Sequence, residues 1–380
     1  MLESGRLIDT ARERTGLRSF GDEWFLEPFG WLVESINRES RLTEAGAAFV
    51  PEMLIAHLVN HLELEDWYAR HPEIDDEEVV APMFGIGMPR TGSTALGHMM
   101  GLDPGTRVLR MWESDRHCPP PEAATQDSDP RIAISQRAED QLVRLVPELN
   151  SMLPRGVTKA TECAFPLAGS FSSGPTYELF LHLPGFVERT MSPAYDMVPA
   201  YRHHKRVMKL LQWRCPPKRW YLRTPMHTFD IEALDEVYPD ANFVMTHRGP
   251  LRSLSSVCSF IYRYRRAFVE NPEPEYLGPM HHAFWAEALR RTLAFRDEHG
   301  EHRFHDVSHR RQVVNPSEQV REVYGHFGWP YDEAMEGRIR EWQQEHPKGR
   351  HESRPEFFAL DPRKVAEDYR FYTERFAQLL

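Results

Sequence analysis

A short turn with a glycine at each end, between an apolar run and a helical pattern, places the strongest constraint on how this chain folds. Residues 79–86 (VVAPMFGI) form an apolar run of strand length, and residues 93–100 have a helical pattern. Between them, Gly87 and Gly92 enclose Met-Pro-Arg-Thr. Terminal glycines let the backbone curl, so that successive N–H groups point inward at an anion. The segment therefore predicts an anion-binding turn, although an ordinary strand-to-helix turn can also contain glycine.

This turn has the spacing of a nucleotide-binding P-loop but lacks its lysine. In the pattern G-x-x-x-x-G-K-[ST], the lysine and the next hydroxyl serve the β- and γ-phosphates and Mg²⁺ of a nucleoside triphosphate. Here Ser93 stands at the lysine position, and Arg90 supplies a positive charge inside the turn. The substitution argues against ATP or GTP hydrolysis.

Further strand and helix patterns alternate along the chain. Strands are predicted over residues 106–112, 219–222 and 242–246, and helices after the first strand, through 229–237 and from Pro250. This alternation indicates a parallel sheet with helices on both faces. We therefore predict an α/β protein with a three-layer fold of the P-loop type around a central parallel sheet.

Helical additions are expected at both ends of this core. Residues 1–78 have an apolar helical face and end in the acidic run 75–78, so they form an N-terminal helical segment packed on the core. The core domain covers residues 79–380. It contains a helical insert at about 114–215, which begins rich in proline and polar residues, and a helical C-terminal part at about 279–380.

Composition excludes several classes of protein. The net charge of −11 over 380 residues argues against a nucleic-acid binder, which needs a basic face. No stretch reaches the roughly 18 apolar residues of a membrane span, and the N-terminus has no apolar run of a secretory signal. The four cysteines are far apart and form neither a disulfide nor a zinc framework. We expect a cytoplasmic protein without a metal.

A second candidate anion site follows the last of these strands. Arg248 lies at the carboxyl end of the strand expected at 242–246, where parallel sheets bind ligands. Gly249-Pro250 then opens a helix, and Ser256 follows Arg248 by eight residues. A guanidinium and a hydroxyl at these positions could share one phosphate. Alone, the pattern is more typical of a simple helix start.

Together, the two segments resemble the sulfotransferases that use 3′-phosphoadenosine 5′-phosphosulfate (PAPS), in their bacterial branch. Residues 87–94 are similar to the 5′-phosphosulfate loop G-x-P-R-[ST]-G-[ST]-T, and Arg248 with Ser256 to the 3′-phosphate site. The resemblance extends over 79–113 and 219–262. It implies in-line transfer of a sulfuryl group from PAPS to a hydroxyl or amine of a small-molecule or lipid-like acceptor. The residues that it assigns to PAPS binding are Gly87, Pro89, Arg90, Thr91, Gly92, Ser93, Thr94, Arg248 and Ser256.

The resemblance also implies catalytic positions. Arg90 would hold the phosphosulfate, and Arg223, before Thr224-Pro225, stands where the family carries a lysine. Arginine is a poor proton donor, so we expect Arg223 to stabilise the leaving group. Glu113, at the end of the strand expected at 106–112, and His227 are the candidate general bases. Either can instead be structural, Glu113 as a helix-capping or ion-paired carboxylate and His227 as a neutral histidine.

The sequence leaves other interpretations open. A P-loop kinase or nucleotide hydrolase and a non-catalytic adenosine-nucleotide-binding protein are the alternatives in other classes. The spaced histidines between 299 and 309 are expected on an exposed turn and strand rather than at a metal. Lys348-Gly349-Arg350 resembles a late basic loop that closes over the co-substrate in the family. The identity of the acceptor and the presence of a homodimer are not readable from the sequence.

Overall fold

A parallel sheet of five strands forms the centre of the molecule in the computed structural model, which describes residues 1–152, 154–216, 219–346 and 354–380. The strand order is β2-β3-β1-β4-β5, and every pairing is parallel. The strands are β1 (Met83–Ile86), β2 (Thr106–Val108), β3 (Arg219–Arg223), β4 (Asn242–His247) and β5 (Phe304–Ser308). This confirms the predicted α/β fold with a central parallel sheet.

The strand order reverses at β1, which lies between β3 and β4. Gly85 of β1 is in register with Arg223 of β3 on one side and with Val244 of β4 on the other. A Cβ atom at Gly85 would lie 3.0 Å from the Cβ atom of Arg223 and 2.6 Å from the hydroxyl oxygen of Tyr221, so only glycine fits there. Open parallel sheets bind ligands beyond the carboxyl ends of the strands at such a reversal. The segments after β1, β3 and β4 therefore meet at one edge.

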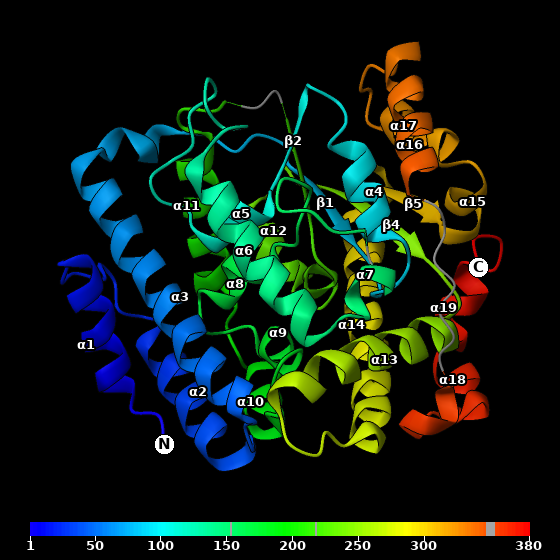
Figure 1. Cartoon of the computed structure of the whole chain (residues 1–380). Helices are drawn as coiled ribbons and strands as arrows, with labels where there is room; N and C mark the ends of the chain where they lie inside the picture. The colour runs from blue at the N-terminus through cyan, green and yellow to red at the C-terminus, as the bar shows by residue number, and fades with distance from the viewer. Residues whose placement is uncertain (153, 217–218, 347–353) are drawn as a thin grey trace.

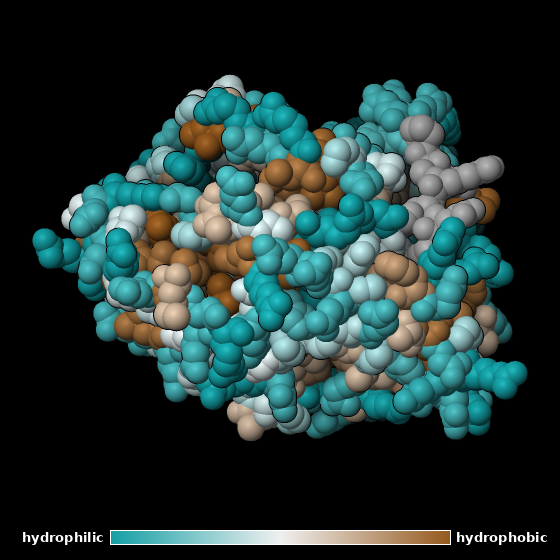
Figure 2. Space-filling view, turned by 60° about the horizontal axis from the view of Figure 1, so that its bottom comes forward, coloured by the Kyte–Doolittle hydropathy of each residue, from teal (hydrophilic) through white to brown (hydrophobic). Residues whose placement is uncertain are grey.

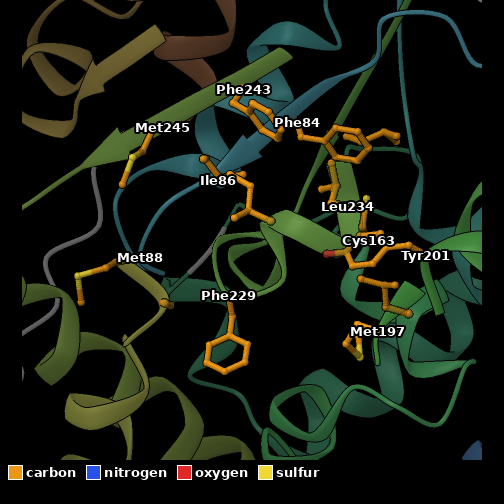
Figure 3. Close-up of a cluster of buried hydrophobic side chains, with 14 of the residues drawn as sticks. Phe84, Ile86, Met88, Cys163, Met197, Tyr201, Phe229, Leu234, Phe243 and Met245 are labelled. Atoms are coloured by element: carbon orange, nitrogen blue, oxygen red, sulfur yellow. The ribbon is translucent and has the colours of Figure 1, made fainter. Parts of the chain in front are cut away.

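Apolar side chains alternate between the two faces of the sheet. Phe84 and Ile86 of β1 and Phe243 and Met245 of β4 join a large core cluster on one face (Figure 3). Helices of the same cluster are α11 (Val198–Gln212), α12 (Ile231–Val237), α13 (Pro250–Phe268) and α14 (Pro274–His299). The opposite face, with Val244, is covered by α4 (Ser93–Met100), α16 (Pro316–His326) and α17 (Glu333–Glu345). This arrangement gives the three layers.

The N-terminal helices form a second core cluster with parts of the insert. They are α1 (Ser4–Thr15), α2 (Leu26–Glu39) and α3 (Glu44–Arg70), followed by the short helix η1 (Pro72–Asp76). Phe25, Phe29 and Leu58 pack there with Phe171 of the insert and Phe268 at the end of α13. These helices lie on the opposite side of the molecule from the C-terminal helices (Figure 1).

The insert between β2 and β3 is helical. Its helices are α5 (Met111–Asp115), α6 (Pro130–Leu145), α7 (Leu149–Met152), α8 (Ala164–Ala168), α9 (Gly174–Glu178), α10 (Pro184–Thr190) and α11. The strand predicted over 106–112 was too long, because β2 ends at Val108 and α5 begins at Met111. A carboxylate oxygen of Glu113 accepts from the N–H of Arg110, and this capping bond starts a helix in place of a longer strand.

The remaining elements are short helices outside the sheet. They are η2 (Pro225–Thr228), η3 (Glu301–Arg303), α15 (His309–Val314), η4 (Pro355–Phe358), α18 (Pro362–Asp368) and α19 (Arg370–Arg375). In the described residues, no helix combines the length and the apolar character that crossing a bilayer requires. One face of the molecule is mainly hydrophilic, with hydrophobic side chains in separate patches (Figure 2).

Candidate active site

The loop between β1 and α4 is shaped by residues with positive φ. Gly87, Arg90 and Gly92 have φ of 111°, 66° and 92°. A Cβ atom at Gly87 would lie 2.6 Å from the carbonyl oxygen of Thr246 in β4, so the loop passes too close to β4 for any other residue. Gly92 is the N-cap of α4 and brings no capping side chain. The first N–H groups of α4 therefore have no side-chain cap from Gly92, and such helix N-termini are suited to bind anions.

Contacts from three other elements hold this loop in place. The N–H of Gly87 donates to the hydroxyl of Thr228 in η2 over 2.7 Å. The hydroxyl of Thr91 donates to the carbonyl of Met88 and lies 2.6 Å from the hydroxyl of Thr246. The amide of Gln312 in α15 donates to the carbonyl of Gly92 over 3.0 Å. These contacts with η2, β4 and α15 fix the position of the loop.

The sequence-predicted residues of the loop differ in exposure. Pro89 and Thr91 are buried, and the hydroxyl of Thr91 is turned inward to β4, which suits a role in shaping the loop. Ser93 and Thr94 are half-buried in the first turn of α4.

The structure brings Arg90, Arg248 and Ser256 together. The Nε of Arg90 donates to the hydroxyl of Ser256 over 3.1 Å, and its Nη2 donates to the carbonyl of Met152 over 3.0 Å. The Nη1 of Arg248 donates to the carbonyl of Arg90 over 2.8 Å. The two sequence segments are 158 residues apart at these arginines, and they form one site.

This site has an excess of positive charge. Within the part of the chain that the structure describes, neither Arg90 nor Arg248 has a carboxylate partner. Burial and the charge of Arg248 lower the pKa of Arg90 to about 10, although the charge of Glu162 acts in the opposite direction. Burial and the charge of Arg252 lower the pKa of Arg248. Two adjacent guanidiniums without acidic partners favour a multiply charged anion between them.

Arg223 lies at the carboxyl end of β3, and only 4% of its side chain is exposed. Its Nη1 is 2.9 Å from a carboxylate oxygen of Glu162, and its Nη2 donates to the carbonyl of Ala160 over 3.4 Å. A Cβ atom at Gly97 in α4 would lie 2.7 Å from the Nε of Arg223. Glycine at this position therefore lets the guanidinium lie against the helix that carries the loop.

Glu162 is a site residue that sequence reasoning missed. The residues on either side of it are held by main-chain hydrogen bonds of 2.8 Å, from Thr161 to Leu109 and from Cys163 to Arg223. The second carboxylate oxygen of Glu162 accepts from the hydroxyl of Thr224 over 3.4 Å. Glu162 lies in the insert outside any motif, and only these long-range contacts bring it to the sheet edge.

Glu113 occupies a different environment. Its side chain is 1% exposed. One oxygen accepts from the Nη2 of Arg107 over 2.7 Å, and the other accepts from the N–H of Arg110 over 3.1 Å. Both oxygens are thus used in an ion pair and a helix cap, and none of these contacts reaches the loop.

His227 is completely buried in η2. Its Nδ1 is 2.8 Å from the hydroxyl of Tyr201, and its ring packs edge-on against Phe84, with centroids 4.9 Å apart. Burial and the nearby His204 lower the pKa of His227 well below its usual value. The histidine is therefore neutral at pH 7 and faces the core.

No metal site is visible in the described residues, where no group of three or more histidine, cysteine or acidic residues could hold an ion. Of the histidines between 299 and 309, His305 lies half-buried on β5, and the ring of His299 stacks on Phe295 with centroids 4.1 Å apart. The segment Lys348-Gly349-Arg350 lies outside the described residues.

The fold is an α/β fold of the P-loop type, and the loop between β1 and α4 has Ser93 at the position of the P-loop lysine. The family model described as "Sulfotransferase family" matches residues 82–333, which is more than half of the chain. The chain therefore belongs to the sulfotransferase family.

Two solved structures are similar over nearly their whole length. Sulfotransferase STF9 from Mycobacterium avium is 24% identical, with a TM-score of 0.90, covering 99% of this chain and 97% of that one. Sulfotransferase STF1 from Mycobacterium tuberculosis H37Rv is 25% identical, with a TM-score of 0.83, covering 97% and 98%. A comparison with the curated proteins gave no match. The similarity to STF9 establishes that the two proteins share a fold.

Proposed function

We propose that this sulfotransferase transfers the sulfuryl group of PAPS to a hydroxyl or amine of a small-molecule or lipid-like acceptor. The observation that carries the proposal is the convergence of Arg90, Arg248 and Ser256 beside the N-terminus of α4. PAPS carries anionic groups at both the 5′ and the 3′ position, and the site offers donors to two such groups. These half-buried arginines, which have no carboxylate partner among the described residues, fit a ligand of this charge.

Each part of the site then has a role in binding. The N–H groups at the start of α4 and Arg90 hold the 5′-phosphosulfate, and the hydroxyls of Ser93 and Thr94 add contacts. Arg248 and Ser256 hold the 3′-phosphate. Because other elements fix the loop, little conformational entropy is lost when the anion binds.

Arg223 has the role of stabilising the departing phosphate. In sulfuryl transfer, negative charge develops on the oxygen that bridges sulfur and phosphorus, and a fixed cation nearby lowers the barrier. Arg223 lies at the end of β3, beside the strand that carries the loop, and is fixed by Glu162 and Ala160. A carboxylate near this position would take the proton of the acceptor.

A P-loop kinase or hydrolase fits the site less well, because Ser93 replaces the lysine that such enzymes direct to the β- and γ-phosphates. Thermal-shift measurements with adenosine 3′,5′-bisphosphate and with Mg·ATP separate the classes. A ligand at 100 times its Kd adds about 2.7 kcal/mol to stability. We expect the bisphosphate to raise Tm without Mg²⁺, whereas a rise with Mg·ATP alone would favour the kinase or hydrolase.

Transfer of labelled sulfate from PAPS then separates an enzyme from a binding protein. A panel of phenols and alcohols serves as acceptor, and a labelled organic sulfate is the expected product. Binding of the bisphosphate without transfer to any acceptor, or to water, would favour a non-catalytic nucleotide-binding protein.

A further inference from the structure

We propose that Glu162 is the general base of this enzyme, an assignment that rests on the proposed function. Glu162 precedes α8 in the insert, and its side chain is 33% exposed. The carboxylate is thus open to an acceptor, yet it contacts Arg223, the residue placed at the leaving group.

The backbone around Glu162 is fixed to two strands of the sheet. Thr161 donates to the carbonyl of Leu109, just beyond β2, and Cys163 donates to the carbonyl of Arg223, the last residue of β3. An isolated antiparallel bridge between Arg110 and Ala160 extends this attachment. Glu162 is therefore carried by the carboxyl edge of the sheet, where parallel sheets place ligands.

The groups around the carboxylate belong to several elements. Arg223 and Thr224 approach it from the end of β3. Burial lowers the pKa of Arg90 in the loop and raises that of Tyr264 on α13; the charge of Glu162 opposes the first shift and adds to the second. Arg223 and Thr224 fix the direction of the carboxylate, as a base positioned for proton transfer requires.

The two bases expected from the sequence are less accessible. The carboxylate of Glu113 is 1% exposed and has both oxygens occupied by Arg107 and Arg110. His227 is fully buried against Phe84 and Tyr201. Of these three candidates, Glu162 combines access to solvent with contact to the site.

The reaction balances with Glu162 as the proton acceptor. The acceptor hydroxyl forms an O–S bond, and the S–O bond to the 5′-phosphate breaks. The bond electrons leave with the bridging oxygen as adenosine 3′,5′-bisphosphate, whose charge faces Arg223. The hydroxyl proton moves to Glu162 and then to water, so no metal or redox partner is needed.

The test compares Glu162→Gln with wild type in two measurements. The first is kcat for transfer from labelled PAPS to the best acceptor of the phenol and alcohol panel. The second is Kd for adenosine 3′,5′-bisphosphate by calorimetry. We expect kcat to fall by about 100-fold or more, the scale of a lost general base, while Kd stays within about threefold. Glu162→Asp should recover part of the rate.

A matched control uses an ion-paired carboxylate far from the site. Glu65 on α3 pairs with Arg206, and its side chain is 17% exposed. Like Glu162→Gln, Glu65→Gln removes the negative charge that pairs with an arginine. It should leave kcat within about threefold of wild type. The control separates an effect on chemistry from a general effect of losing an ion pair.

Two results would overturn the assignment. Wild-type kcat in Glu162→Gln would exclude Glu162 as the base, above all if Glu113→Gln loses the rate instead. A large loss of bisphosphate affinity in parallel with kcat would mean that Glu162 only holds Arg223 in place. Failure of wild type to bind the bisphosphate would overturn the proposed function itself, so the two failures are distinct.

Discussion

Arg248, at the end of β4, donates a hydrogen bond of 2.8 Å to the main-chain carbonyl of Arg90 in the loop after β1. The side chain that we assign to the 3′-phosphate thus also supports the loop that we assign to the 5′-phosphosulfate. An anion bound at Arg248 would therefore stabilise the loop, and an anion bound at the loop would stabilise Arg248, because this hydrogen bond joins the two.

Loss of Arg248 should weaken nucleotide binding strongly. In Arg248→Ala, a charge-assisted hydrogen bond worth about 1.5–3 kcal/mol is removed, so Kd for adenosine 3′,5′-bisphosphate should rise about 10- to 150-fold in calorimetry. Arg252, one turn into α13 and exposed, provides the control. Arg252→Ala should change Kd by about threefold at most, because solvent screens its charge. Equal effects of the two variants would argue against a specific 3′-phosphate contact.

Gly97→Ala should impair catalysis through Arg223. The added Cβ atom would lie 2.7 Å from the Nε of Arg223, so the guanidinium must shift. Placement errors of this size can cost about 100-fold in rate, and we expect kcat to fall on that scale. At Gly5 in α1, an added Cβ atom would meet no other group within 4 Å, so Gly5→Ala is the control. An unaltered kcat in Gly97→Ala would remove Arg223 from the leaving-group role.

Glu113→Ala should destabilise the fold. Removing one partner of a buried ion pair costs about 3–5 kcal/mol, and here a helix cap is lost as well. Urea unfolding followed by circular dichroism measures this change. The exposed pair of Glu34 and Arg38 is the comparison, and Glu34→Ala should cost less than about 1 kcal/mol. Similar losses in both variants would contradict the structural role of Glu113.

Buried histidines should make the protein sensitive to mild acid. Burial is the main cause that lowers the pKa of His57 and His117 to about 4, and of His61, His204 and His281 to about 3. The unfolded chain takes up these protons near pH 6.5. The contribution of these neutral histidines to the free energy of unfolding is therefore fully present above about pH 6.5. It is lost as the pH falls toward their pKa values in the folded state.

The effect should be visible between pH 6.5 and 5. As the pH falls through this window, each such histidine lowers the free energy of unfolding by up to about 1.4 kcal/mol per pH unit. Asp115 and Asp230 act in the opposite direction, because burial raises their pKa to about 6 and about 7, but they are fewer. The urea midpoint should fall steeply in this window. A constant midpoint from pH 7 to pH 5 would contradict this burial of the histidines.

Local patterns were sufficient to predict much of the fold. The apolar run, the glycines at 87 and 92 and the following helical pattern lie within one short segment, and the structure has β1, the loop and α4 there. Parallel strands bring their carboxyl ends together, so the meeting of Arg90 and Arg248 also follows from the predicted topology.

One local helix cap and two long-range contacts decided what the patterns did not show. The end of β2 depends on Glu113, whose carboxylate takes the N–H of Arg110 and begins α5. Glu162 reaches the site because Thr161 and Cys163 bond to residues more than 50 positions away along the chain. Helix capping was one of the structural roles that the sequence allowed for Glu113, whereas the contacts of Thr161 and Cys163 leave no periodic pattern or motif.

We propose above all that the lysine-free loop and Arg248 together bind a nucleotide with anionic groups at its 5′ and 3′ positions. Calorimetric titration of the wild-type protein in EDTA, with adenosine 3′,5′-bisphosphate and with adenosine 5′-monophosphate, tests it most directly. We predict one site per chain, with the bisphosphate binding at least about tenfold more tightly because only it reaches Arg248 and Ser256. Equal affinity for the two nucleotides, or no binding of the bisphosphate without Mg²⁺, would contradict the claim.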